Sequence, residues 1–251
     1  MSVSSEAVKR PAPLTAPGSE ARAREHRFFG GMAIALAVTV FAGFAPTYYL
    51  HGPLHSPFPL TTALKWHGAA FTTWMLLLVA QTSLVAANRT DLHRRLGVAG
   101  AALAVIMVGL GAYIAISRTA AGLTTAPPGM SVYVLLAVAL MTIVVFPALV
   151  GAALWYRRRT DFHKRLMLIA TLELVTAAVA RLPFITPFGP PAFFGATDLF
   201  LGAIVIYDLV TLRRVHPATL WGGLFLIASQ PLRLVIGFSA AWQALAGSLL
   251  G

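Results

Sequence analysis

The sequence predicts an all-α, polytopic membrane protein with seven transmembrane helices. Of its 251 residues, 58% are apolar and only 11% are charged, and the mean hydropathy is +0.77. Soluble domains typically carry about 25% charged residues, so this composition indicates an integral membrane protein. Two further observations support this class: seven long apolar stretches, and a concentration of Lys and Arg in alternate loops.

The seven apolar stretches are each long enough to cross a bilayer. A helix needs about 20 apolar residues to span roughly 30 Å of hydrocarbon. Proline-rich and glycine-rich turns separate several of them, as in "HGPLHSPFP" after the first and "PFITPFGPP" after the fifth. We expect helices over residues 27–49, 60–87, 93–117, 131–155, 163–183, 192–211 and 217–240.

The first 24 residues are rich in Ser, Ala and Pro and lack the apolar core of a signal peptide. This composition predicts a disordered cytoplasmic tail. The remaining residues, 25–251, are expected to form a single domain made of the seven helices.

Orientation follows from the basic residues. Fifteen of the 19 Lys and Arg residues fall on one side of the predicted spans. The positive-inside rule makes this side cytoplasmic, with the N-terminus inside. The net charge of +11 is thereby explained without nucleic acid as a partner. The cytoplasmic basic residues are Lys9, Arg10, Arg22, Arg24, Arg27, Arg89, Arg94, Arg95, Arg157, Arg158, Arg159, Lys164, Arg165, Arg213 and Arg214.

Two nearly identical octets mark the cytoplasmic starts of the third and fifth spans. They read "RTDLHRRL" (89–96) and "RTDFHKRL" (159–166), and they indicate duplication of a two-helix unit, with spans two and three corresponding to spans four and five. Their Thr and Asp residues are good helix N-caps. The Arg and Lys residues that end each octet are expected to lie among lipid phosphates.

Each octet also carries a histidine, His93 or His163, in the expected first helical turn. One interpretation is that the octets only cap helices and contact headgroups. The other is that the two imidazoles meet and bind one metal ion or haem b, since imidazole is a common neutral metal ligand. Spacing alone leaves both open.

Three more histidines, His51, His55 and His67, lie toward the opposite side. The first two have the i, i+4 spacing of a metal site on a helix, although Gly52 and Pro53 between them favour a loop. A copper or zinc site formed by the three is one hypothesis, and haem binding by His67 is another.

Polar residues inside the spans are candidates for a ligand cavity. His67, Trp74, Gln81 and Asn88 recur every seven residues and are therefore expected to share one stripe of the second span. Such a stripe either bonds helices to one another or lines a ligand site.

Ionisable residues extend this set into spans five to seven. We expect Glu173 near the midplane and Asp198 slightly above it. A buried lone charge costs at least about 2.5–3.5 kcal/mol, so the two acids should pair with the two arginines. Either they form a structural network, or they line an outward-open cavity. The expected cavity residues are Trp74, Gln81, Glu173, Arg181, Asp198, Gln230 and Arg233.

Several functional classes are excluded or disfavoured. The chain has no cysteine, which excludes thiolate metal sites, iron–sulfur clusters and covalent c-type haem. Spans six and seven contain no lysine, so no retinal Schiff base can form there. No late helix carries the HxxxH motif of the seven-helix zinc hydrolases.

The stretch from His67 to Gly97, with Gln81, Arg89 and "LHRRLG" in that order, resembles uncharacterised bacterial multipass membrane families with a His…Gln…Arg…HRxLG pattern. The "HKRLML" that begins the fifth span is similar to another such family, often associated with cytochrome oxidase genes. The resemblance implies a bacterial inner-membrane protein and a neighbourhood of haem or copper.

The sequence therefore leaves three functions open. The first is a redox-associated protein that binds haem b or a metal ion through histidines. The second is a module that binds or transports a small ligand or protons. The third is an accessory subunit of a larger membrane complex, such as a respiratory complex. Whether the protein is an enzyme stays undecided.

Overall fold

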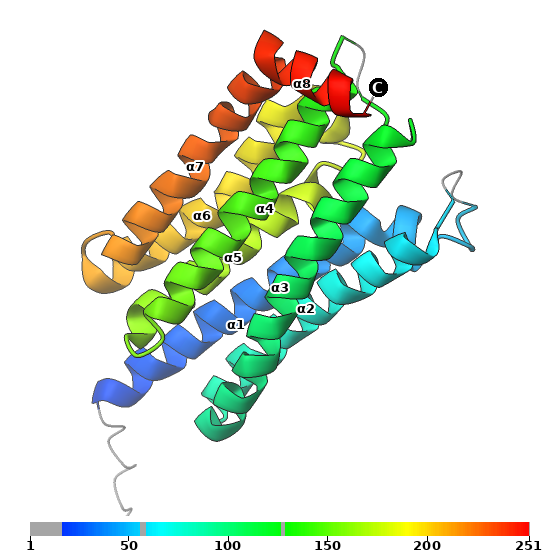
Figure 1. Ribbon diagram of the computed structural model, residues 1–251. Helices are drawn as coiled ribbons and strands as arrows, with labels where there is room; N and C mark the ends of the chain where they lie inside the picture. Colours follow the sequence, from blue (N-terminus) through cyan, green and yellow to red (C-terminus); the bar gives the residue numbers. More distant parts are fainter. Residues whose placement is uncertain (1–16, 56–58, 127–128, 251) are drawn as a thin grey trace, which may run out of the picture.

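The computed structural model describes residues 17–55, 59–126 and 129–250, and these residues form helices and connecting turns without a β-strand. Seven long helices lie side by side, and a short eighth helix lies against one end of the bundle (Figure 1). The helices are α1 (Pro17–Phe44), α2 (Thr62–Ala86), α3 (Thr90–Ala120), α4 (Val132–Trp155), α5 (Thr160–Val179), α6 (Gly189–Leu212), α7 (Pro217–Phe238) and α8 (Ala240–Leu250). A π-helical turn (Ala45–Tyr49) extends α1, and a short 3-10 turn (Thr186–Phe188) precedes α6.

Six of these helical segments are long and apolar enough to cross a membrane, which confirms a multipass, all-helical protein. They contain α1, α2, α3, α4, α6 and α7. The exception is α5, which carries Asp161, Lys164, Arg165 and Glu173 within its 20 residues.

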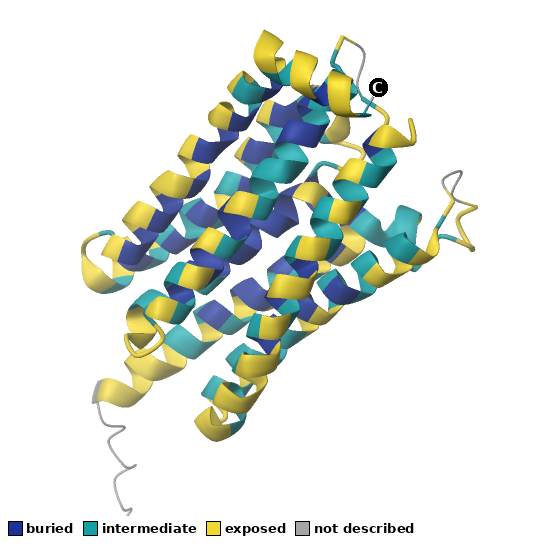
Figure 2. Cartoon of the chain, viewed as in Figure 1, coloured by how far each residue is buried: buried dark blue, intermediate teal, exposed yellow. Residues whose placement is uncertain are grey.

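Helix α5 occupies the centre of the bundle, where it packs against α1, α4, α6 and α7. Most of its residues from Arg165 to Val179 are buried by these neighbours, and Figure 2 shows the buried residues concentrated in this interior. A helix enclosed by other helices contacts little lipid, so its polar side chains need protein partners. This position explains why the most polar helix is also the most deeply buried.

Two predicted boundaries are corrected. The expected disordered tail, 1–24, overlaps α1, because residues 17–24 are already helical. The segment "PGSEARAR" places Pro at the first helical position and continues with good helix formers, Ala, Glu and Arg. Residues 1–16 lie outside the described part of the chain.

The second correction concerns the C-terminus, where the sequence predicted no element after residue 240. Helix α8 begins there, because the Ser239 hydroxyl accepts a hydrogen bond from the Trp242 amide (3.2 Å) and caps a new helix. The Trp242 indole then donates to the Tyr133 carbonyl (2.7 Å) and fixes α8 against α4.

The contact between α1 and α5 depends on Gly43. A Cβ atom placed there would clash with the carbonyl oxygen of Ala178, which is backbone and cannot move aside. We expect Gly43→Ala to lower the free energy of unfolding by about 1–3 kcal/mol through overpacking. This effect is measured by heating the purified protein and monitoring the loss of its monodisperse gel-filtration peak.

The matched control is Gly30→Ala on the same helix, where a Cβ would meet no atom within 4 Å. This change should be neutral or slightly stabilising, because alanine is the better helix former by about 1 kcal/mol. Equal stability of the two variants would contradict the predicted close approach.

Candidate functional site

The two octet histidines meet at the end of the bundle that carries the arginine-rich loops, residues 87–89, 156–159 and 213–216. We call this the arginine-rich end. His93 lies in the first turn of α3 and His163 in the first turn of α5. Their ring centroids are 6.2 Å apart, and the ring planes are nearly perpendicular (88°). The repeated motif therefore brings two imidazoles together from helices that are not neighbours in sequence.

The hydrogen bond of His163 determines which of its nitrogens is free. Its Nδ1 lies 2.8 Å from the carbonyl oxygen of Ala153 on α4. A carbonyl only accepts, so Nδ1 carries the proton and the Nε2 of neutral His163 has a free lone pair. Metal-binding histidines are commonly oriented in this way, with the second nitrogen donating to a carbonyl.

One ring nitrogen of this histidine pair and one oxygen of a nearby amide are buried without a hydrogen-bond partner. They are Nδ1 of His93 and Oε1 of Gln81. The two residues are in contact, since the Gln81 amide Nε2 donates to the backbone carbonyl of His93 (3.2 Å). Buried polar groups are nearly always satisfied, so two such atoms at one place indicate a missing partner, such as an ion or a water molecule.

The spacing of the two rings is compatible with a shared ion. A metal–imidazole bond of about 2.1 Å places the centroids of two ligating rings roughly 5–6 Å apart in a tetrahedral site. The observed 6.2 Å is slightly longer, so the rings would move a little closer on binding. No cluster of three or more His, Asp or Glu residues with metal-binding geometry occurs among residues 17–55, 59–126 and 129–250. The two imidazoles would thus be supplemented by an amide oxygen from Gln81 rather than by a carboxylate.

The histidines expected at the opposite end of the bundle are not gathered in this way. His55 is exposed in the turn after α1 and has a left-handed backbone (φ 48°). His67 stacks on Phe71 with ring centroids 4.2 Å apart, and its Nδ1 is buried without a partner. His51, His55 and His67 do not form a metal-ligand cluster in the described structure.

The charges deep in the bundle are paired with one another. Arg233 on α7 forms a bidentate ion pair with Glu173 on α5, with distances of 2.8 and 3.1 Å, and each side chain is only 1% exposed. Glu173 also accepts from the Thr142 hydroxyl on α4 (2.7 Å). Because Arg233 donates further to the Ser229 hydroxyl and carbonyl, the pair is enclosed and extensively hydrogen-bonded.

The other residues expected to line a ligand cavity are distributed over separate contacts. Gln230 donates to Asp198 (2.8 Å), one turn of α7 from Arg233. Trp74 is buried and donates to the Thr171 hydroxyl (3.2 Å). Gln81 lies beside His93.

Arg181 differs from the expectation that both arginines pair with acids. It is exposed just after α5, where it donates to the Ala177 carbonyl (2.6 Å) and lies over the Phe44 ring (4.4 Å). Asp198 is instead bonded to a neutral amide. The structure thus forms one of the two expected ion pairs.

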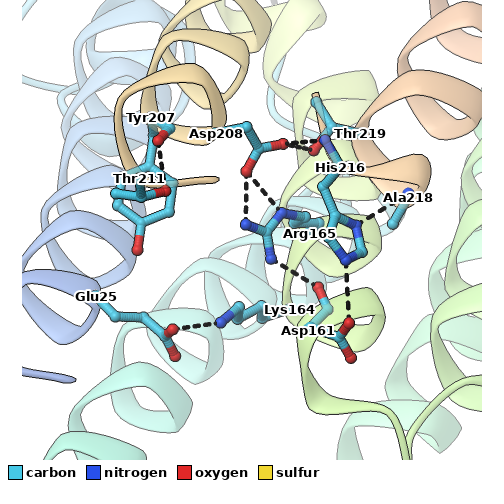
Figure 3. A network of polar contacts seen from close by, with 10 residues as sticks. All are labelled: Glu25, Asp161, Lys164, Arg165, Tyr207, Asp208, Thr211, His216, Ala218 and Thr219. Atoms are coloured by element: carbon cyan, nitrogen blue, oxygen red, sulfur yellow. Dashed lines mark hydrogen bonds and ion pairs between the residues drawn. The ribbon is translucent and has the colours of Figure 1, made fainter. Parts of the chain in front are cut away.

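A second enclosed ion pair was not predicted from the sequence. Arg165 on α5 binds Asp208 on α6 through Nε (2.9 Å) and Nη2 (2.5 Å), and the two side chains are 3% and 0% exposed (Figure 3). Asp208 also accepts from the His216 amide (3.1 Å) and the Thr219 hydroxyl (2.6 Å). The expectation that Arg165 lies among lipid phosphates is therefore wrong. The signal that could have found this pair is Asp208 itself, a second acid besides Asp198 within the predicted span 192–211.

The twin octets therefore differ in their surroundings. Asp91 is exposed and lies 3.4 Å from Arg89, whereas Asp161 bonds to His216 (3.0 Å), whose other ring nitrogen caps α7 by accepting from the Ala218 amide. The expected side-chain caps from the octets are absent at both helices: the capping positions are Arg89 and Arg159, and neither side chain makes a cap bond.

No protein-family model matches the chain, and no curated protein or solved structure is similar to it at a significant level.

Proposed function

We propose that this protein binds a transition-metal ion at the arginine-rich end, held by His93 and His163 with Gln81 as a third ligand. The observation that carries the proposal is the meeting of the two imidazoles, together with two buried atoms that have no hydrogen-bond partner, Nδ1 of His93 and Oε1 of Gln81. The bond from His163 to Ala153 orients one imidazole as a ligand. Two imidazoles and one amide oxygen suit Zn²⁺ or Cu²⁺.

A single ion fits this geometry better than haem b. A haem ligated by both histidines needs the width of a porphyrin between their helices. Helix α4 packs against both α3 and α5, and its Ala153 carbonyl is bonded to the His163 ring (2.8 Å). A haem would therefore require the helices to move apart, whereas an ion needs only small side-chain rotations.

The proposal includes a topology. We infer that α5 crosses the membrane together with the six apolar segments, because neighbouring helices cover its charged residues. The arginine-rich loops favour a cytoplasmic arginine-rich end and a cytoplasmic N-terminus. The resemblance of the octet region to bacterial multipass families supports an inner-membrane location.

The enclosed Glu173–Arg233 pair favours a structural role for the mid-bundle charges. A proton or ligand path needs an ionisable group that is free to change partners, whereas both partners here are 1% exposed and bonded. We propose that this pair joins α5 to α7 and does not line a transport cavity.

Metal binding is tested on detergent-purified protein stripped with chelator and then dialysed against Zn²⁺ or Cu²⁺. We expect about one ion per chain by elemental analysis, and at least roughly tenfold weaker binding for His93→Ala and for His163→Ala, since each loses a direct ligand. His55→Ala, an exposed histidine outside the proposed site, is the control and should bind normally.

Gln81→Leu should weaken binding without abolishing it, because two imidazoles remain. Metal binding unchanged in both single histidine variants would refute the proposal. A Soret band that is present in the wild type and absent from those variants would identify the bound group as haem b instead of a metal ion.

A further inference from the structure

The end of the bundle opposite the arginine-rich end is cationic and lacks acidic residues. No Asp or Glu occurs in sequence segments 45–66, 112–131, 180–197 or 236–251, and the described residues of these segments form the helix ends and connections there. The same segments contain Lys65, Arg118 and Arg181. Cations without acidic partners attract anions from their surroundings.

A cavity of about 340 Å³ lies at this end, between the first turn of α2 and the last turns of α3. Arg118 supplies the positive charge in the lining of this cavity. Its Nη2 donates to the Leu123 carbonyl (2.7 Å), which fixes the guanidinium, and its other N–H groups make no further hydrogen bond or ion pair within the described residues. The remaining polar lining consists of hydroxyl-bearing side chains, Thr61, Thr62, Tyr113 and Ser117.

Arg181 adds to the positive potential, since it lies close enough to Arg118 for the two charges to interact. Phe44, at the end of α1, lies under the Arg181 guanidinium and helps to set its position. One turn further on, Tyr48 packs against Gly68, the residue that follows His67. Nδ1 of His67 is buried without a partner. Two guanidinium groups, from α3 and from the loop after α5, are therefore close together without a counter-charge among the described residues.

We propose that this cavity binds a phosphate group, either the headgroup of a phospholipid or a free phosphate compound. A guanidinium donates to two phosphate oxygens at once, and hydroxyl groups supply further donors. The cavity also opens beside the first turn of α2, where the helix dipole adds positive potential. Its position at the helix ends is the depth at which lipid phosphates lie.

The first experiment measures inorganic phosphate binding to the delipidated full-length protein by thermal stabilisation, at constant ionic strength with chloride as the reference anion. We expect phosphate to raise the unfolding temperature of the wild type. Arg118→Gln should weaken this binding at least about tenfold, the typical effect of losing hydrogen bonds to a charged group. Arg118→Lys should restore part of it by keeping the charge.

Lys65→Gln is the control, because it removes the same charge from the same end at a residue outside the cavity lining. It should retain most of the phosphate effect. Arg181→Gln, which leaves the lining intact, should weaken binding by less than Arg118→Gln does. Gel filtration and the unfolding temperature without phosphate verify that each variant is folded.

The second experiment identifies the source of the phosphate group by native mass spectrometry with vesicle-derived phosphatidylglycerol. Retention of this lipid by the wild type and by Lys65→Gln, with loss in Arg118→Gln, assigns a lipid headgroup. A response to inorganic phosphate without lipid retention assigns a soluble phosphate compound. Equal behaviour of Arg118→Gln and Lys65→Gln in both experiments would overturn the proposal.

Discussion

Replacing Glu173 by Gln is expected to lower the free energy of unfolding by about 3–5 kcal/mol, because it leaves the Arg233 guanidinium buried without its counter-ion. The new side chain has the size of the old one, so the loss is electrostatic and does not arise from packing. In a chain of this length the denaturation midpoint should fall by roughly 10 °C. Detergent-purified protein heated stepwise and analysed by gel filtration provides the measurement.

Two variants separate the ion pair from other causes. Thr142→Val removes only the hydroxyl that donates to Glu173 and should cost about 1 kcal/mol. The double change Glu173→Leu with Arg233→Met removes both charges together and should recover much of the stability lost in the single variant. A double variant less stable than Glu173→Gln would contradict this account.

Asp208→Asn is expected to have a similar effect, a loss of about 3–5 kcal/mol, because Arg165 then carries an uncompensated buried charge. The substitution also replaces one carboxylate oxygen by an amide nitrogen. Such a nitrogen cannot accept from the His216 amide or the Thr219 hydroxyl, both of which now donate to the carboxylate. The same heating experiment measures the result.

The control for this second pair is Asp161→Asn. Asp161 is at the same end of the bundle and bonds to His216, but its side chain is 52% exposed. Water screens an exposed pair, so this change should cost less than about 1 kcal/mol. If Asp161→Asn proved as damaging as Asp208→Asn, burial would not be the reason for the importance of Asp208.

Much of the fold was predictable because the bilayer imposes strict requirements on sequence. Six of the expected apolar segments correspond to helices that are long and apolar enough to span a membrane. The ends of α2 and α4 differ from the expected 60–87 and 131–155 by no more than two residues. Helix α5 was expected as the apolar stretch 163–183. The structure places it at Thr160–Val179, and it is not among the six segments that are long and apolar enough to span a membrane.

The candidate site was only partly predictable. The two similar motifs at corresponding helix starts suggested a meeting of His93 and His163 as one of two interpretations, and the structure places their rings 6.2 Å apart. The Gln81 side chain was assigned to a cavity with Glu173 and Arg233, but it lies beside His93 instead. Periodicity along α2 identifies which side chains share a stripe. It does not identify which neighbouring helix each of these side chains contacts.

The twin octets separate what the sequence determined from what the tertiary structure decided. Composition and the length of the apolar segments predicted an all-helical membrane protein, and the distribution of arginine predicted which loops share one end. Both properties depend on the free energy of transferring each segment from water to lipid, which the sequence alone determines. Only the packing of the helices decided that Arg165 is 3% exposed and paired with Asp208, while its counterpart Arg95 is exposed. The physical reason is position: α5 is enclosed by four helices, whereas α3 lies at the periphery, so the same motif binds a buried acid in one and faces its surroundings in the other.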